Sequence, residues 1–262
     1  MCIRDRFIYC VSSCRKQVDK GFEMTVDLSI SNPYLPMSVL VDTIESVRLQ
    51  LPSPYFWGMV DNVISKDSCY YISDRKQEMA FRFSKNGTFL NAIGQRGEGP
   101  GEYREMDSFF VGKDCVYVCD MGKRTIYSYS FDGKFLHSLS FPYSLVFNDV
   151  VELPDGRFLC HRPSQSENCK GLWILDQKGR RVKNLLEYEK GTPCKNSYWN
   201  TLCAQEDGTI KIYNPVDGSY YQYDAVNDTV VRTMRQKSNL PMLADFHCSD
   251  RELYETKEEC TY

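Results

Sequence analysis

The stretch Asn86-Gly87-Thr88-Phe89-Leu90, a tight-turn dipeptide followed by an apolar pair, recurs along the chain at nearly constant intervals. Its counterparts are Asp132-Gly133-Lys134-Phe135-Leu136, Lys178-Gly179-Arg180-Arg181-Val182 and Asn227-Asp228-Thr229-Val230-Val231. The second residues of these stretches follow one another at steps of 46, 46 and 49 residues. A fixed period of this length is typical of repeat architectures. The sequence therefore contains four visible copies of one structural unit.

A second marker keeps the same register as these turns. The stretch Cys69-Tyr70-Tyr71-Ile72-Ser73-Asp74 returns 46 residues later as Cys115-Val116-Tyr117-Val118-Cys119-Asp120. In both copies the Asp lies 13 residues before the Gly of the turn that follows. Two markers that keep step with each other argue against a chance coincidence.

The residues around the turns predict antiparallel strands. Asn-Gly and Asp-Gly reach the positive φ values of tight hairpin turns at low cost, and β-branched and aromatic residues suit the strands beside them. Earlier turns in each unit are Lys66-Asp67, Lys113-Asp114, Asp155-Gly156 and Asp207-Gly208. Each unit is therefore a small sheet, and neighbouring sheets must stack to bury both faces. The sequence predicts an all-β fold, a β-propeller of four-stranded antiparallel blades.

One string carries a resemblance to a known family. Ile93-Gly94-Gln95-Arg96-Gly97-Glu98-Gly99-Pro100-Gly101-Glu102-Tyr103 resembles the IGxxGxGPGEY signature of the six-bladed β-propeller proteins of Bacteroidota, relatives of NHL-repeat propellers. The second unit is similar to an NHL repeat, except that Thr125 stands where the usual Arg precedes the Ile. The resemblance implies a six-bladed ring.

The number of visible units is smaller than the resemblance implies. Six blades need on the order of 270 residues, whereas Met59 to Lys237 accounts for four units and 25 residues follow. We therefore expect a partial propeller over residues 37–262, incomplete at the C-terminus, with a smaller closed ring as the alternative. By the resemblance, Val39 to Leu49 is expected to be the N-terminal strand that completes the last blade.

The first residues suggest a lipoprotein signal. Val11-Ser12-Ser13-Cys14 matches a lipobox, which predicts that Cys14 is lipidated unless the match is fortuitous. The apolar stretch before it, Phe7 to Val11, is too short for the apolar region of a signal peptide. Residues 1–14 are therefore interpreted as a signal remnant with an artefactual start.

Residues 15–36 would then tether the propeller to a membrane through the lipid. The acidic run that marks surface export in Bacteroidota is absent from Arg15 to Asp19, which favours the periplasmic side of the cell envelope. No stretch of 18 apolar residues occurs, so we expect contact with the membrane only through the lipid anchor.

Composition narrows the function classes. The net charge is −3 and there is no basic stripe, which argues against nucleic acid. Twelve cysteines occur without a CxxC pair; Cys69 and Cys115 hold equivalent positions that favour a packed core, whereas Cys169 and Cys194 have the placement of loop residues that could pair. Three histidines stand at unrelated blade positions, and no hydrolase, metalloprotease or phosphate-binding motif occurs. No catalytic residue and no dedicated metal ligand is assigned.

A polar pair recurs where the innermost strand of each blade is expected to begin. The four pairs are Asp61-Asn62, Asp107-Ser108, Asn148-Asp149 and Asn200-Thr201. They have two interpretations: Asp and Asn that cap turns, or a polar ring at the mouth of the central channel that binds a ligand. The ligand-binding interpretation takes Asp61, Asp107, Asn148, Asp149 and Asn200 as site residues.

The glycine-rich string adds three further candidates, with the same choice between roles. Arg96 and Tyr103 could face the channel, and Glu102 could bind a ligand or instead accept hydrogen bonds from the backbone of its own loop.

Three functions follow from these patterns. The leading one is a non-enzymatic binding module of the cell envelope that offers its loop face to a protein, peptide or glycan, without a cofactor. The second is an enzyme of the propeller lactonase or lyase type, in which Asp and Asn side chains hold Ca²⁺. The third is a structural partner in an outer-membrane complex.

Overall fold

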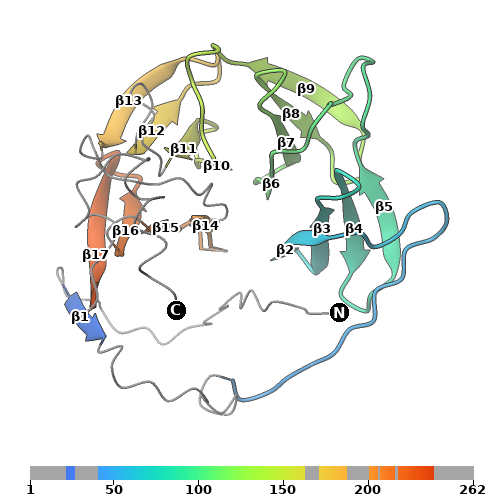
Figure 1. The fold of residues 1–262 in the computed structure, drawn as a ribbon, viewed down its shortest axis with the longest axis horizontal. Helices are drawn as coiled ribbons and strands as arrows, with labels where there is room; N and C mark the ends of the chain where they lie inside the picture. Colours follow the sequence, from blue (N-terminus) through green and yellow to red (C-terminus); the bar gives the residue numbers. More distant parts are fainter. Residues whose placement is uncertain are drawn as a thin grey trace, which may run out of the picture.

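The structure is a computed structural model that describes residues 22–26, 41–162, 171–187, 201–205, 207–215 and 218–238. Within these residues, four sheets stand around a common centre, as Figure 1 shows. The first strand of each sheet lies nearest the centre and the fourth lies at the rim (Figure 1). The predicted all-β propeller of four-stranded antiparallel blades is confirmed. The described part contains four blades, and the six of the resemblance are not shown.

The blades follow one another in chain order. Blade one is β2 (Val60–Lys66), β3 (Cys69–Asp74), β4 (Met79–Ser84) and β5 (Phe89–Ile93). Blade two is β6 (Ser108–Val111), β7 (Val116–Asp120), β8 (Thr125–Tyr129) and β9 (Phe135–Ser140). Blade three is β10 (Asp149–Glu152), β11 (Phe158–Arg162), β12 (Gly171–Leu175) and β13 (Arg181–Leu186). Blade four is β14 (Leu202–Ala204), β15 (Ile210–Asn214), β16 (Ser219–Asp224) and β17 (Thr229–Ser238), with β1 (Phe22–Val26) parallel to β17 at its edge.

The turns that defined the repeat connect the strands as expected. Asn86-Gly87 joins β4 to β5, and Asp132-Gly133 joins β8 to β9. Gly133 has a φ of 81°, and a Cβ added there would lie 2.1 Å from the carbonyl oxygen of Ala92 in blade one. This turn therefore needs glycine twice, for its backbone conformation and for the close approach of the neighbouring blade.

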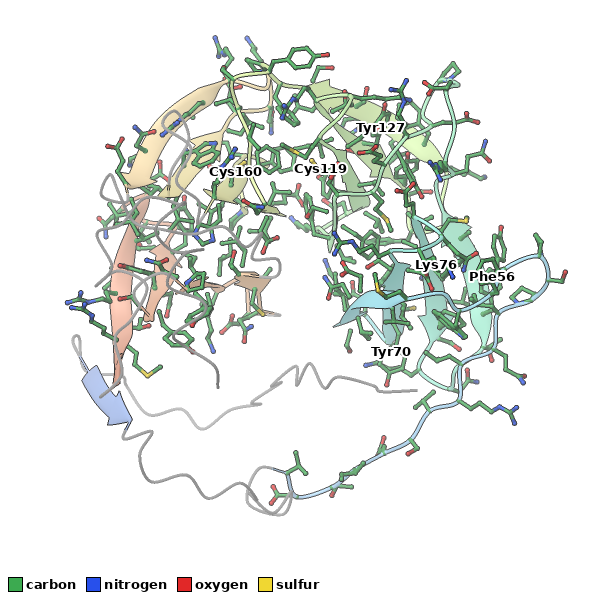
Figure 2. All side chains as sticks on the ribbon, in the orientation of Figure 1. Phe56, Tyr70, Lys76, Cys119, Tyr127 and Cys160 are labelled. Carbon is green, nitrogen blue, oxygen red and sulfur yellow. The ribbon has the colours of Figure 1, made fainter. Side chains whose placement is uncertain are left out.

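The core lies between the blades. One cluster joins blades two and three, and Figure 2 labels two of its members, Cys119 of β7 and Cys160 of β11. A second cluster joins blades one and two and contains Cys69, and a third joins blades three and four. Cys69 and Cys115 are both 6% exposed, so the interpretation of the two equivalent cysteines as core residues is confirmed. Each fully buried large side chain stabilises the fold by roughly 1.5–3 kcal/mol.

The N-terminal strand was placed wrongly by the sequence analysis. Residues 41–50 form no strand, and the strand that pairs with β17 is β1, which falls inside the segment expected to be a tether. Leu49, Leu51 and Tyr55 instead pack over Phe81 and its neighbours on the outer face of blade one. The large aromatic side chains of that face must be covered, and this requirement decides the path of the segment.

Several predictions lie outside the described residues: Val39 and Leu40 of the expected strand, the lipobox with Cys14, the cysteines Cys169 and Cys194, and Asn200. Within the described part of the chain, no helix is long and apolar enough to cross a membrane.

Candidate functional site

Three of the four predicted polar pairs meet at one point. A small hollow of about 10 Å³ is bordered by Asp61-Asn62 from β2, Asp107-Ser108 at the start of β6, and Asn148-Asp149 at the start of β10. Ser73 of β3 and Phe109 of β6 complete its border. The first strands of neighbouring blades lie side by side around the centre (Figure 1), so the repeat brings equivalent positions together. The sequence analysis expected these pairs at the starts of the innermost strands, and three of them border this hollow. Of the fourth pair, Asn200 is outside the described residues, and Thr201 contacts Asp149.

Asp149 is the most buried carboxylate of the hollow, with 7% exposure. Its Oδ1 accepts a hydrogen bond from the backbone N–H of Val150 at 2.9 Å. Its Oδ2 accepts one from the backbone N–H of Leu202 at 2.9 Å and one from the hydroxyl of Thr201 at 3.4 Å. Burial raises the pKa of Asp149 to about 6, against the effect of these hydrogen bonds. Asp149 therefore ties blade three to blade four, which favours the structural interpretation of this residue.

A buried histidine belongs to the same contact. His161 stands opposite Asp149 in the β10–β11 ladder and is 0% exposed. Its Nδ1 lies 2.6 Å from the hydroxyl oxygen of Thr201. Burial lowers the pKa of His161 to about 3, so the imidazole is neutral at pH 7. The sequence analysis missed this residue, and the only signal was its position one strand away from Asn148-Asp149.

The side chains of Asp107 and Asp61 accept fewer hydrogen bonds from the described residues than that of Asp149 does. The Oδ2 of Asp107 accepts a hydrogen bond from the backbone N–H of Met121 at 2.7 Å. Burial raises the pKa of Asp107, and the nearby charges of Glu105 and Asp120 act in the same direction. Asp61 is half-buried. The hollow therefore gathers three carboxyl groups, and no Lys or Arg borders it.

Ser73 supplies an unusual group at this border. It is 1% exposed, and its hydroxyl has no hydrogen-bond partner among the described residues. Alternation along β3 puts Ser73 on the same face as Cys69 and Tyr71, which pack against blade two. Most buried polar groups in proteins are hydrogen-bonded, so an unpaired hydroxyl beside a hollow requires an explanation.

The glycine-rich string, by contrast, makes hydrogen bonds within its own loop. The Oε2 of Glu102 accepts a hydrogen bond from the backbone N–H of Gly99 at 2.7 Å, and its Oε1 accepts one from Gln95. The bond from Gly99 lowers the pKa of the Glu102 carboxyl. Tyr103 is 0% exposed, and burial raises its pKa. Neither residue borders the hollow: Tyr103 has no open surface, and the half-buried Glu102 is hydrogen-bonded within its own loop.

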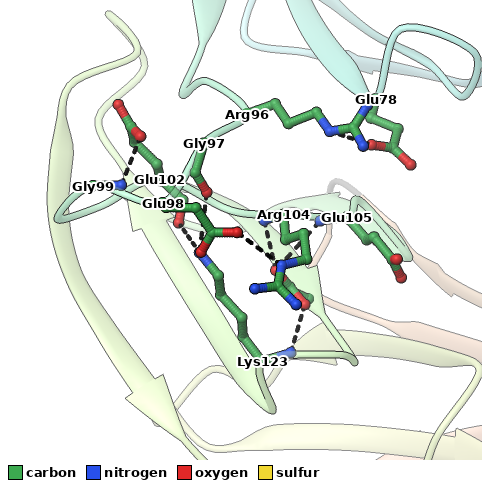
Figure 3. Close-up of polar contacts among 10 residues, drawn as sticks. Glu78, Arg96, Gly97, Glu98, Gly99, Glu102, Arg104, Glu105 and Lys123 are labelled. Carbon is green, nitrogen blue, oxygen red and sulfur yellow. Dashed lines mark hydrogen bonds and ion pairs between the residues drawn. The ribbon is translucent and has the colours of Figure 1, made fainter.

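Charged residues fasten this loop to blade two, as Figure 3 shows. Lys123 donates hydrogen bonds at 3.1 Å to the carbonyl oxygens of Gly97 and Glu102. Arg104 pairs with Glu98 at 2.9 Å. Arg96, the third candidate from the string, points away from that contact and pairs with Glu78 at 3.1 Å (Figure 3). The loop is a crossover between blades one and two.

The Asp that ends the second strand of blades one and two has a structural role. Asp74 and Asp120 are both 0% exposed. Asp74 accepts hydrogen bonds from four backbone N–H groups, those of Gly58, Met59, Lys76 and Gln77. These bonds hold the segment that enters the blade against the turn that follows the second strand. The sequence marker is thus a clamp within each of these two blades.

No three His, Cys, Asp or Glu side chains among the described residues are placed so that they could hold a metal ion. The Ca²⁺ site of the enzyme hypothesis therefore has no preformed set of carboxylate ligands in this part of the chain.

Three solved structures are similar to this chain, and the first of them has the same fold. A protein of Bacteroides fragilis whose name describes it as exported shares 21% identity and a TM-score of 0.65, over 81% of this chain and 59% of that one. A protein of unknown function from Bacteroides caccae shares 13% identity with a TM-score of 0.40, over 70% of this chain and 61% of that one. Virginiamycin B lyase from Staphylococcus aureus shares 11% identity with a TM-score of 0.44, over 66% of this chain and 55% of that one. The chain thus spans about three fifths of the length of the Bacteroides fragilis protein, and at this identity the likeness shows the fold alone.

No curated protein matches the chain. A family model does: the one described as Domain of unknown function (DUF4934) matches residues 23–259. This range contains all four blades and β1 except for its first residue, Phe22. The chain therefore belongs to the DUF4934 family, and its described residues form a β-propeller.

Proposed function

We propose that the protein is a non-enzymatic binding module of the cell envelope, which takes its ligand at the hollow where β2, β6 and β10 meet. The observation that carries the proposal is the convergence of Asp61-Asn62, Asp107-Ser108 and Asn148-Asp149 on that hollow. Polar groups that a rigid scaffold gathers from separate elements are the usual material of a binding site. A protein, a peptide or a glycan that enters along the channel is the ligand, and nucleic acid is not.

The free bonding capacity of the hollow supports this proposal. Among the described residues, no hydrogen bond reaches the side chains of Asp61 and Asn148 or the Oδ1 of Asp107, and the hydroxyl of Ser73 is unpaired. These groups have no structural task that the fold reveals. A ligand would supply the partners that they lack.

The remaining polar groups support binding rather than catalysis. Asp149 uses both carboxylate oxygens to join blades three and four. His161 is neutral and in contact with Thr201. A general acid or base must be able to reach the substrate, and these two ionisable groups are used in packing the blades together.

The location and the ring size belong to the same proposal. The protein is lipid-anchored through Cys14 on the periplasmic side, and it is one of the six-bladed propellers of Bacteroidota. The resemblance of the Ile93–Tyr103 string supports this placement, as does a structural neighbour from Bacteroides fragilis named as exported. That neighbour is long enough to hold additional blades, since the present chain spans 59% of it.

The anchor is tested by membrane fractionation of a chain that carries a complete signal peptide. The chain with Cys14 is expected in the membrane fraction, and Cys14→Ala is expected in the soluble fraction. If the two forms partition equally, the anchor assignment is wrong.

The binding site is tested by NMR on the ¹⁵N-labelled 262-residue chain with panels of peptides, oligosaccharides and small cations. The proposal expects ligand-dependent shifts at the amides of residues 61–62, 107–109 and 148–149. The amides of the opposite turns, such as Lys113-Asp114, serve as the internal control. Shifts confined to those turns, or none with any panel, would overturn the proposal.

A further inference from the structure

We propose that the group which enters the hollow is a primary ammonium, carried by an alkyl chain such as the side chain of a lysine. This inference rests on the proposed function, because it names the chemistry of the ligand at the same site. Size, charge and hydrogen-bonding capacity each lead to it.

The volume of the hollow limits what can enter. It measures about 10 Å³, which is room for about one water-sized group. A sugar ring, an aromatic base or a branched side chain is too large for it. A single –NH₃⁺ group is of the right size, and its alkyl chain would then extend into the central channel.

The charge of the border selects a cation. Asp61, Asp107 and Asp149 place three carboxyl groups around the hollow, and no Lys or Arg borders it. Carboxylates that share a small site raise one another's free energy, and a cation between them relieves that repulsion. Burial is the main reason that the pKa of Asp107 is raised, and the negative charges of Glu105 and Asp120 add to that effect.

The free acceptors match the donors of an ammonium group. The described structure leaves four groups at the border without a partner: Asp61, Oδ1 of Asp107, the side-chain amide of Asn148 and the hydroxyl of Ser73. An ammonium group donates three hydrogen bonds and accepts none. A hydrogen bond from a cation to a carboxylate is about twice as strong as a neutral one. Three of these four acceptors are therefore sufficient to hold the group.

A metal ion suits this border less well. Ca²⁺ takes six to eight oxygen ligands, often carboxylates, at short distances. The described residues offer no three His, Cys, Asp or Glu side chains placed to hold a metal. Hydrogen bonds to an ammonium group need fewer and more widely spaced acceptors. Calcium binding is accordingly one of the outcomes that the test must be able to detect.

The experiment measures binding to the 262-residue chain by NMR at constant ionic strength. The probes are n-butylammonium, tetramethylammonium, CaCl₂, a neutral oligosaccharide panel and the tripeptide Gly-Lys-Gly with blocked ends, alone and acetylated on the lysine. We expect n-butylammonium and the free lysine peptide to shift the amides of residues 61–62, 107–109 and 148–149. Tetramethylammonium has no N–H donor and the acetylated peptide has no charge, so neither should bind.

Two variants and one control locate the bound group. Asp107→Asn keeps an oxygen for the N–H of Met121 but removes the charge, and it should weaken n-butylammonium binding by about 10-fold or more. Ser73→Ala removes an unpaired hydroxyl, so folding should be undisturbed while binding weakens by about 2- to 10-fold. Asp114 lies in an exposed turn at the far end of β6, so Asp114→Asn should leave the affinity for n-butylammonium unchanged.

The outcomes separate this inference from the proposed function. If Ca²⁺, tetramethylammonium or neutral oligosaccharides shift the hollow and n-butylammonium does not, the ammonium assignment is wrong and the binding site remains. If Asp107→Asn and Ser73→Ala bind n-butylammonium as tightly as Asp114→Asn does, the group is held elsewhere. If no probe shifts these amides, both proposals fail. Binding of butylammonium without the lysine peptide would identify a free alkylamine, rather than a lysine side chain, as the natural source.

Discussion

Replacement of Asp120 by alanine is expected to destabilise the propeller strongly, because its buried carboxylate holds two parts of blade two together. Asp120 is 0% exposed. Its Oδ2 accepts hydrogen bonds from the backbone N–H groups of Arg104 at 2.7 Å and Glu105 at 3.3 Å, and its Oδ1 accepts one from Lys123 at 2.7 Å. The carboxylate therefore joins the segment that enters blade two to the turn between β7 and β8.

The magnitude follows from the three N–H groups that lose their acceptor. A stranded buried donor costs about 1–3 kcal/mol. Arg104 and Glu105 are exposed residues, so water can reach part of this site and the lower end of that range applies. Asp120→Ala is therefore expected to lower the free energy of unfolding by about 3 kcal/mol, a large part of the total stability of a domain. The midpoint of thermal unfolding should fall by about 6–12 °C.

The assay is urea unfolding followed by circular dichroism, with two matched variants. Asp114→Ala removes an exposed carboxylate from a turn of the same blade and should change the stability by less than about 0.5 kcal/mol. Asp74→Ala removes the equivalent clamp of blade one, which serves four N–H groups, and should cost at least as much as Asp120→Ala. If Asp120→Ala is no more harmful than Asp114→Ala, the clamp interpretation is wrong.

Three further expectations concern turns, pH and the contact between blades three and four. Gly133→Ala should lower the free energy of unfolding by at least about 1 kcal/mol more than Gly208→Ala does. Both glycines have a φ of 81°, but only a Cβ added at Gly133 meets a backbone atom of the neighbouring blade. Equal urea midpoints of the two variants would contradict this close approach of the blades. Burial lowers the pKa of His161 to about 3, so on acidification the imidazole binds a proton in the unfolded chain before it does in the folded chain. The free energy of unfolding therefore falls as the pH drops from about 6.5 towards 3. His161→Gln should flatten that part of the curve of unfolding free energy against pH, and an unchanged slope would refute the buried, neutral state of His161. Arg157 holds Asp228 through two hydrogen bonds at 3.0 and 3.2 Å, so Arg157→Ala should cost about 1–3 kcal/mol at pH 7. Burial acts against the ionised form of Asp228, but the bonds from Arg157 outweigh it and lower the pKa to about 2, so stability is present above pH 3.8 and lost as the pH falls through 2; a wild-type acid slope in Arg157→Ala would exclude this role.

Part of the site could be predicted because the chain repeats itself. A polar pair at the start of each innermost strand must recur at the centre of the ring, and residues 61–62, 107–108 and 148–149 do meet there. Ser73 and His161 were missed because neither belongs to a pair and both lie on the second strand of their blades. Ser73 borders the hollow, and His161 contacts Thr201. The only signal that a single sequence offers for such residues is a position one strand away from a polar pair.

The glycine-rich string shows the opposite case. Its residue types, Arg96, Glu102 and Tyr103, suit a ligand site as well as they suit a loop, and the sequence left both roles open. Tertiary packing supports the loop: Glu102 bonds to Gly99 and Tyr103 is buried. The prediction of an N-terminal strand at residues 39–49 was wrong for a similar reason. Val41 and Ile44 are residue types that favour strands, but they remain exposed in a segment that forms no strand.

The sequence by itself determined the blades. Turn residues with positive φ and alternating apolar strands act over a few neighbouring positions, so Asn86-Gly87 and Asp132-Gly133 mark the same hairpin wherever the rest of the chain lies. Only the tertiary structure decided what lies between the blades. It determined which acceptors remain unpaired at the hollow and that Asp149 accepts a hydrogen bond from the backbone N–H of Leu202. It also determined that β1, and not residues 41–49, pairs with β17. These contacts join residues far apart in the chain, and burial and hydrogen bonding at such contacts depend on atoms that no local pattern specifies.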